Sequence, residues 1–350
     1  MNTLTDWQGL PKVLLHEHLD GGLRPQTLLE LCTAQGIPLP APDAPALAAW
    51  MQANADSGSL VRYLQGFALT VNAIATLDAC ERVAFEAAED ARLDGCVLAE
   101  FRMAPLLLEP FGLAPEAVIE AVCAGLARSS LESGLIVCAM RTDSAESSLR
   151  AARIAGGYQG QGVVGFDLAG AEFGYPPGLH ASALKLAGEA GLGLTCHAGE
   201  ADAGIRVLEA AALGATRIGH GVNIMKAPSP TEGEAWLEEA RRLGLHFEVC
   251  PSSNVHTGAA PSLAAHPILA MLRAGLSVSC STDNRLMSGV TLSDEFRRLH
   301  EHLGLEADEA SQLMLNAAKA SFLPADSRER AGRAIASWRN ALPGNYVNSL

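Results

Sequence analysis

Histidine and acidic residues in this chain occur in short motifs that could hold a metal ion. His16 and His18 flank Glu17 in an apolar run, and the motifs Thr-Cys-His-Ala-Gly-Glu and Ser-Thr-Asp-Asn carry His197 and Asp283. On a β-strand, positions i and i+2 face the same side, so both imidazoles of the first motif can reach one cation, whereas Glu17 faces away. Imidazole and carboxylate ligands suit Zn²⁺ and leave room for a reactive water. The spacing therefore predicts a metal site.

Two more polar side chains complete a possible reaction centre. Glu200 lies three residues after His197, where the chain turns away from a strand, and a carboxylate near an activated water can transfer protons to a substrate. His220, in Arg-Ile-Gly-His-Gly-Val, could be a further ligand, a hydrogen-bond partner of that water or a packing residue. No lysine falls within the middle or late strand-like runs, where a carboxylated lysine commonly bridges two metals in barrel hydrolases. A single metal ion per chain is therefore favoured.

Eight short apolar runs, typical of buried strands, would position these residues. They are residues 13–20, 96–103, 135–141, 163–170, 193–200, 217–222, 246–254 and 278–284. Amphipathic stretches with helical spacing, such as residues 77–92, separate most of the runs. Because such alternation implies a parallel sheet, we predict an α/β fold, a (β/α)8 TIM barrel, with an open doubly wound sheet as the alternative. The carboxyl ends of barrel strands meet at one mouth, which would bring the polar motifs together.

One interval between the runs is much longer than the others. Residues 21–95 hold a loop rich in proline and alanine and at least two helix candidates. An insertion after the first barrel strand would lie over the mouth of the barrel, so we interpret it as a helical lid; a surface insertion without a role is the alternative. No linker indicates a second domain, and residues 1–350 are expected to form one domain.

Composition and charge restrict the class of protein. Of 350 residues, 49% are apolar and 18% charged, which excludes a disordered chain. The 25 Lys and Arg against 39 Asp and Glu give a net charge of −14 without any basic run, so we expect no nucleic-acid or membrane partner. The start lacks the pattern of a signal peptide, and no window has the length of a membrane span. The eight cysteines form no C-x-x-C pair, which favours a reducing cytoplasm.

Six short motifs, in order along residues 11 to about 290, resemble those of the adenosine deaminase family of the amidohydrolase superfamily. They are Pro-Lys-Val-Leu-Leu-His-Glu-His-Leu-Asp-Gly at 11–21, Glu-Phe-Arg-Met-Ala-Pro at 100–105, Gly-Phe-Asp-Leu-Ala-Gly-Ala-Glu at 165–172, His-Ala-Gly-Glu at 197–200, Gly-His-Gly at 219–221 and Ser-Thr-Asp at 281–283. Each motif is short, but six in the family's order make a specific match. The resemblance implies a zinc enzyme of purine salvage that hydrolyses adenosine and 2′-deoxyadenosine to inosine and 2′-deoxyinosine plus ammonia.

The resemblance also implies roles for the residues of the reaction centre. The residues that would hold one Zn²⁺ are His16, His18, His197 and Asp283, and Asp283 would also act in catalysis. Glu200 would protonate the purine ring nitrogen next to C6. His220 would orient the attacking hydroxide rather than bind the metal.

For the substrate, the resemblance implies contacts from the strand ends and from the insertion. His18 would contact the nucleoside, Asp20 would accept the ribose 5′-hydroxyl, and the Gly170 amide would meet another ring nitrogen. The residues of the insertion that resemble the apolar helix covering the substrate are Leu60, Tyr63, Leu64 and Phe67. Their spacing puts them on one helix face, which an ordinary core face would also show.

The chain departs from the family's pattern at Asn284, where the family usually has a second Asp after Asp283. That Asp must be protonated to donate a hydrogen bond to purine N7, whereas an Asn amide donates without any proton requirement. Two alternatives to the main hypothesis remain. One is a related aminohydrolase that acts on adenine, an N6-modified purine, a nucleotide or another adenine derivative, and the other is a non-catalytic purine-binding protein.

Overall fold

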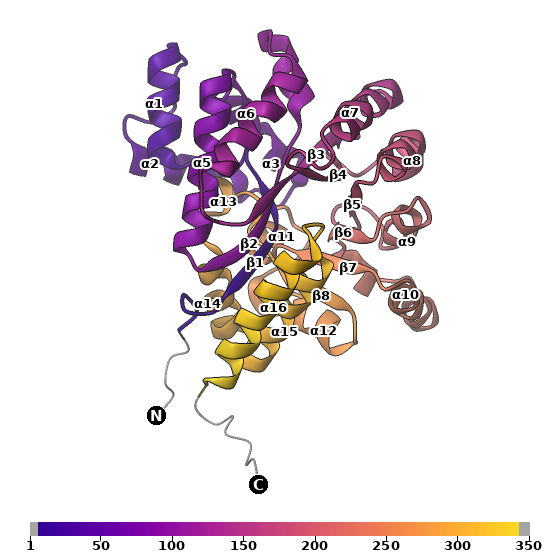
Figure 1. Cartoon of the computed structure of the whole chain (residues 1–350). Coiled ribbons are helices and arrows are strands. Elements are labelled where there is room, and N and C mark those ends of the chain that lie inside the picture. The colour runs from indigo at the N-terminus through magenta and orange to yellow at the C-terminus, as the bar shows by residue number, and fades with distance from the viewer. Residues whose placement is uncertain (1–5, 343–350) are drawn as a thin grey trace.

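Eight parallel β-strands form the centre of the computed structural model, which describes residues 6–342 (Figure 1). They are β1 (Lys12–His18), β2 (Cys96–Met103), β3 (Ser133–Met140), β4 (Val163–Ala169), β5 (Gly193–Ala198), β6 (Arg217–His220), β7 (His246–Val249) and β8 (Ser277–Cys280). Each strand pairs in parallel with the next one along the chain. A parallel bridge between Glu17 and Asp283 joins the first strand to the segment after the last. The predicted (β/α)8 barrel is confirmed.

The later strands are shorter than the sequence predicts. The expected runs reach residues 222, 254 and 284, but β6, β7 and β8 end at His220, Val249 and Cys280. After β7 the helix α11 (Pro251–His256) begins, and its proline suits the first turn of a helix, where no amide hydrogen is needed. After β8 the backbone of Asp283 adopts a left-handed conformation, with φ of 62°. Apolar composition alone did not reveal these strand ends.

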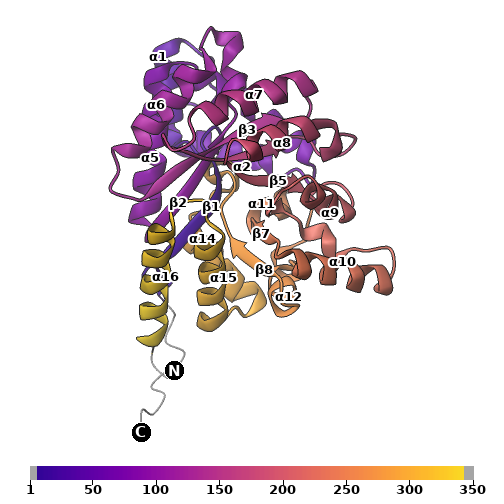
Figure 2. The same ribbon diagram turned by 45° about the vertical axis from the view of Figure 1, so that its right-hand side comes forward.

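An outer layer of helices covers the barrel. It contains α5 (Leu77–Leu93), α6 (Pro115–Ala127), α7 (Ala145–Gly157), α8 (Ala181–Glu189), α9 (Ile205–Ala212), α10 (Pro230–Leu243), α12 (Ile268–Arg273), α14 (Leu292–Leu303), α15 (Ala307–Ala320) and α16 (Ala325–Asn340). Helices α7 to α10 follow one another around the outside (Figure 1). Helix α15 contacts both β8 and β1, and α16 contacts β1 and β2, so this pair covers the place where the barrel closes (Figure 2).

The insertion after β1 consists of helices. They are α1 (Pro25–Gln35), α2 (Ala44–Ala55), α3 (Leu60–Gln65) and α4 (Phe67–Ala73), and α5 then leads into β2. Helix α5 is amphipathic, is capped by the Thr76 side chain and packs against α6 and β2, so it belongs to the barrel wall. Among the helices of the described chain, none alone is long and apolar enough to cross a membrane; residues 60–73 and 77–93 reach that length and composition only together, bent by 118°.

Paired charges fill part of the barrel interior. Glu248 on β7 accepts hydrogen bonds from Arg102 on β2, at 2.6 Å, and from Arg217 on β6. Arg102 also donates to Asp167, at 2.9 Å, and Arg217 to Glu100. All five side chains are at most 1% exposed. Since a buried charge is tolerated only when it is paired, each arginine is held between two carboxylates.

Replacing one of these arginines should destabilise the whole barrel. Arg102→Met leaves two buried carboxylates with one positive partner fewer, and we expect the free energy of unfolding in urea to fall by about 3–5 kcal/mol. The control is Arg242→Met, which breaks an exposed pair with Glu239 on one helix and should have little effect. A loss for Arg102→Met no larger than that of the control would contradict the role of the network.

Candidate active site

A cavity of about 390 Å³ lies at the carboxyl ends of the strands. Its wall contains the residues expected from the sequence to contact substrate, namely His18, Asp20, Leu60, Tyr63, Leu64, Phe67, Gly170 and Asn284. It also contains His197, Glu200, His220 and Asp283. His16 is fully buried, on the strand that also carries His18. The barrel thus brings together the residues that the sequence motifs distribute over most of the chain.

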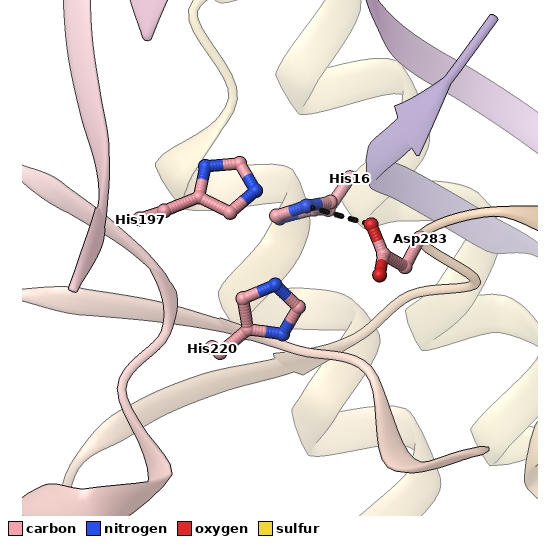
Figure 3. A group of neighbouring side chains, drawn as sticks. All are labelled: His16, His197, His220 and Asp283. Atoms are coloured by element: carbon pink, nitrogen blue, oxygen red, sulfur yellow. Dashed lines mark ion pairs between the residues drawn. The ribbon is translucent and has the colours of Figure 1, made fainter. Parts of the chain in front are cut away.

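Four side chains in this region can share one metal ion. His16, His197, His220 and Asp283 each offer an atom, and these atoms lie within 4.8 Å of one another (Figure 3). His18 is also close, since its Nε2 lies 3.3 Å from Nε2 of His197 and 3.6 Å from Oδ1 of Asp283. The four ligands expected from the sequence therefore converge, and His220 is a fifth group of suitable type.

Buried carboxylates orient two of the imidazoles. Glu248 Oε2 lies 2.9 Å from Nδ1 of His16, and Asp167 Oδ2 lies 3.0 Å from Nδ1 of His197. An ionised carboxylate only accepts, so each Nδ1 carries the hydrogen and each Nε2 lone pair faces the cluster. Nε2 of His16 is buried and has no hydrogen-bond partner among residues 6–342. Lone pairs that converge on one point beside a carboxylate fit a bound cation.

Asp283 is held in place from two sides. Ser253 donates to its Oδ2 at 2.6 Å, while Oδ1 lies 3.3 Å from Nε2 of His16. Burial opposes its charge, but the surrounding imidazoles, His16 first among them, hold the pKa of this carboxyl well below its usual range. Asp283 and His220, with φ of 62° and 61°, are the only non-glycine residues of positive φ in residues 6–342. This conformation costs about 1–3 kcal/mol per residue, and both cases lie at the site.

Glu200 is placed as an acid. Thr257 donates to its Oε1 at 2.9 Å, Asn254 Nδ2 lies 3.5 Å from the same oxygen, and His220 Nε2 lies 3.6 Å from Oε2. Burial, together with the nearby charge of Asp283, raises the pKa of Glu200 to about 8. At neutral pH the carboxyl is therefore mainly protonated and can donate to a ring nitrogen in the cavity.

Glu172 fixes the loop that carries Glu200. Its carboxylate accepts hydrogen bonds from four successive backbone amides, those of Gly199, Glu200 at 2.9 Å, Ala201 at 2.7 Å and Asp202 at 3.1 Å. Four amides directed at one carboxylate form an anion-binding nest. The backbone of Glu200 is therefore fixed independently of its side chain.

Sequence reasoning missed several of these supporting residues. Glu172 was identified only as the final residue of a motif, and no functional role was predicted for Asp167 or Glu248. The sequence does hold a signal for Asp167 and Glu248, because both lie within apolar strand-like runs. A carboxylate buried there needs a positively charged or hydrogen-bond-donating partner. Asn254 is the last residue of a strand-like run and Thr257 follows that run, and neither position carries such a signal.

Two short helices supply part of the apolar cavity wall. Leu60, Tyr63 and Leu64 lie on α3, and Phe67 begins α4 after a break at Gly66. The spacing predicted one continuous helix, and this prediction is wrong because the helix breaks at Gly66. All four side chains nevertheless line the cavity. That this insertion acts as a lid remains a prediction.

The fold and the site together define a class of protein, the metal-dependent hydrolases built on a (β/α)8 barrel. The family model for adenosine deaminase matches residues 11–338. An adenosine deaminase of Mycobacterium sp. (strain JLS) is 43% identical over 345 residues, which cover 93% of this chain and 94% of the relative. The chain belongs to the adenosine deaminase family, and it is a hydrolytic deaminase.

Solved structures of related enzymes share this fold. The crystal structure of adenine deaminase from Arthrobacter aurescens matches with a TM-score of 0.85 and 27% identity, over 95% of this chain and all of that one. The Arabidopsis N6-mAMP deaminase matches with a TM-score of 0.82 and 25% identity, over 95% of this chain and 99% of that one. Relatives with this architecture thus include deaminases of several adenine derivatives.

Removing one ligand should abolish metal binding without unfolding the chain. His16→Ala deletes a converging nitrogen, so we expect the purified variant to lose the metal that the unchanged protein holds, at about one ion per chain. Elemental analysis by mass spectrometry measures this content. The matched control is His246→Ala, because His246 is also buried but its ring bonds to Ser277 and Ser279 rather than to the cluster. Full metal content in His16→Ala would contradict the assignment.

Proposed function

We propose that this chain is a zinc-dependent enzyme that converts adenosine or 2′-deoxyadenosine and water into inosine or 2′-deoxyinosine and ammonia. The observation that carries the proposal is the position of Glu200, a buried carboxyl with its pKa raised to about 8, beside the histidine and aspartate cluster in one cavity. Membership of the adenosine deaminase family supports the same reaction.

The residues that would hold the ion are His16, His18, His197 and Asp283. Three neutral imidazoles and one carboxylate are a donor set that Zn²⁺ prefers, and His16 Nε2 has no hydrogen-bond partner in the described part of the chain. Bound there, zinc would lower the pKa of water so that hydroxide forms at neutral pH.

The protein's own residues would carry the proton transfers. Glu200 donates its proton to the ring nitrogen next to C6, which withdraws electrons from C6 and favours attack there. A bond forms between C6 and the oxygen of water, and the bond between C6 and the amino nitrogen then breaks. In the overall balance, one proton of the water goes to the amino nitrogen, which leaves as ammonia, and the other restores the acid form of Glu200. His220 and Asp283 lie beside the point of attack, where they orient the oxygen.

Three further residues would position the purine nucleoside. A Cβ at Gly21 would lie 1.9 Å from Oδ1 of Asn284, so the amide packs tightly against this glycine, and its Nδ2 would donate to N7. The Gly170 amide would meet another ring nitrogen. The buried Oδ1 of Asp20 has no hydrogen-bond partner within the described residues, lies 3.9 Å from Nδ1 of His18, and would accept the ribose 5′-hydroxyl.

The charge of the cavity wall favours a nucleoside over a nucleotide. No lysine or arginine is among the residues that line the cavity, whereas Asp20, Glu200 and Asp283 are. The arginines considered from the sequence lie elsewhere in the described chain: Arg24 and Arg285 pair with Asp90, Arg102 lies in the barrel interior, and Arg62 does not line the cavity. A phosphate in the cavity would therefore find acidic side chains and no lysine or arginine to pair with.

The expected compartment is the reducing cytoplasm. All eight cysteines are free thiols, and seven of them are buried. A buried thiol that pairs with no other cysteine is compatible with a reducing environment.

Glu200→Gln should separate chemistry from metal binding. The amide keeps the shape of the side chain but has no acidic proton, so we expect kcat for adenosine to fall by about 10²–10⁴-fold. Metal content and thermal midpoint should stay close to those of the unchanged protein. Loss of the metal in this variant, or unchanged turnover, would contradict the role of Glu200 as the proton donor.

A panel of substrates tests the choice of a nucleoside. Zinc-loaded protein is given adenosine, 2′-deoxyadenosine, adenine and AMP in parallel, and the products are separated by chromatography. We expect inosine and 2′-deoxyinosine, with adenine and AMP unchanged. Turnover of adenine alone would contradict the proposed contact between Asp20 and ribose. Turnover of AMP alone would contradict the conclusion that the cavity wall disfavours a phosphate.

A further inference from the structure

A line of buried hydrogen bonds begins at a backbone amide and ends at the ring of His220. The first bond runs from the Ile268 amide to Nδ1 of His266, at 3.2 Å. A backbone amide can only donate, so Nδ1 of His266 must hold a lone pair. Burial and the charge of Lys226 lower the pKa of His266 to about 3, so the ring is neutral at ordinary pH. Its single ring hydrogen therefore lies on Nε2.

The second bond fixes the orientation of an amide side chain. Nε2 of His266 lies 3.3 Å from Oδ1 of Asn254, and since this nitrogen carries the hydrogen, it must face the amide oxygen. The other end of the amide, Nδ2, then lies 3.0 Å from Nδ1 of His220 and 3.5 Å from Oε1 of Glu200. The opposite orientation would place two hydrogen donors against each other at His266.

The third bond determines the tautomer of His220. An amide nitrogen only donates, so Nδ1 of His220 must accept, and the hydrogen of the neutral ring lies on Nε2. This nitrogen lies 3.6 Å from Oε2 of Glu200. Asn254, His266 and His220 are 0%, 3% and 1% exposed, so bulk water does not compete for these bonds.

We propose that Asn254 and His266 are positioning residues that hold His220 in the tautomer with hydrogen on Nε2. In this state the neutral ring has no free lone pair, because Nδ1 accepts from Asn254 and Nε2 carries the hydrogen. His220 is then excluded as a metal ligand, although its distance from the other ligands would permit it. It presents a donor to the cavity.

A consequence for the reaction rests on the proposed function. A ring that donates from Nε2 can hydrogen-bond to the oxygen that attacks C6, and it cannot take a proton from that oxygen at the same nitrogen. The tautomer itself depends on the hydrogen bonds alone and can be measured without any substrate.

Nuclear magnetic resonance reads the tautomer directly. The zinc-loaded full chain is labelled with ¹⁵N-histidine, and long-range ¹H–¹⁵N correlations show which ring nitrogen of each histidine carries the hydrogen. Spectra of His220→Gln and His266→Gln identify the signals of these two residues. We expect hydrogen on Nε2 in both rings of the unchanged protein. Hydrogen on Nδ1 of His220, which coordination through Nε2 would require, would overturn the proposal.

Asn254→Asp tests the role of the amide. A carboxylate can only accept, so the hydrogen of His220 should move to Nδ1, and kcat for adenosine should fall by about 10²-fold or more, as expected for a wrong tautomer, with a smaller change in KM. The control is His246→Gln, which alters a buried histidine outside this line of bonds and should leave the His220 signals unchanged.

The outcomes distinguish this inference from the proposed function. Hydrogen remaining on Nε2 of His220 in Asn254→Asp would show that Asn254 does not set the tautomer. If the variant does not fold, the spectrum of the unchanged protein still decides the tautomer. An unchanged protein with hydrogen on Nε2 but no turnover of adenosine would contradict the proposed substrate and leave the tautomer assignment intact.

Discussion

The buried carboxylate of Glu248 links β7 to four other strands of the barrel. Glu248 on β7 accepts hydrogen bonds from His16 on β1, Arg102 on β2, Thr195 on β5 and Arg217 on β6. An unpaired carboxylate at this depth would cost several kcal/mol, and these four donors, two of them arginines, stabilise its charge. Because His16 is one of these donors, the same interaction that stabilises the barrel interior also orients a candidate metal ligand.

The barrel and the location of the site were predictable from the sequence, because both depend on local patterns. Apolar runs at regular spacing indicate buried parallel strands, and polar residues at their ends converge whenever the sheet closes. His18, Glu200 and Asp283 could be placed at one mouth by this reasoning alone. The apolar character of a run does not report where hydrogen bonding stops, so β7 was expected to extend to residue 254, whereas α11 already begins at Pro251.

The support around the site was not predictable, since it depends on contacts between distant segments. The Glu172 carboxylate accepts hydrogen bonds from four backbone amides of the loop after β5. His266, which follows α11 in the chain, lies within hydrogen-bond distance of Asn254. The left-handed backbone of His220 and Asp283 likewise has no signal in composition, since most residue types avoid it. At Asp283 it is maintained by backbone bonds to His16 and His18 on β1.

Those backbone bonds also lie where the barrel closes. Around the sheet, β8 meets β1 through Asp283, whose amide donates to His16 and whose carbonyl accepts from His18. A cation bound by these three side chains would cross-link the first strand to the segment after the last one, much as a disulfide closes a long loop. Ion binding and closure of the cylinder are then thermodynamically linked, and linkage is reciprocal. The closed barrel would bind the ion more tightly by the same free energy by which the bound ion would stabilise closure. The free energy of unfolding would therefore depend on the supply of metal.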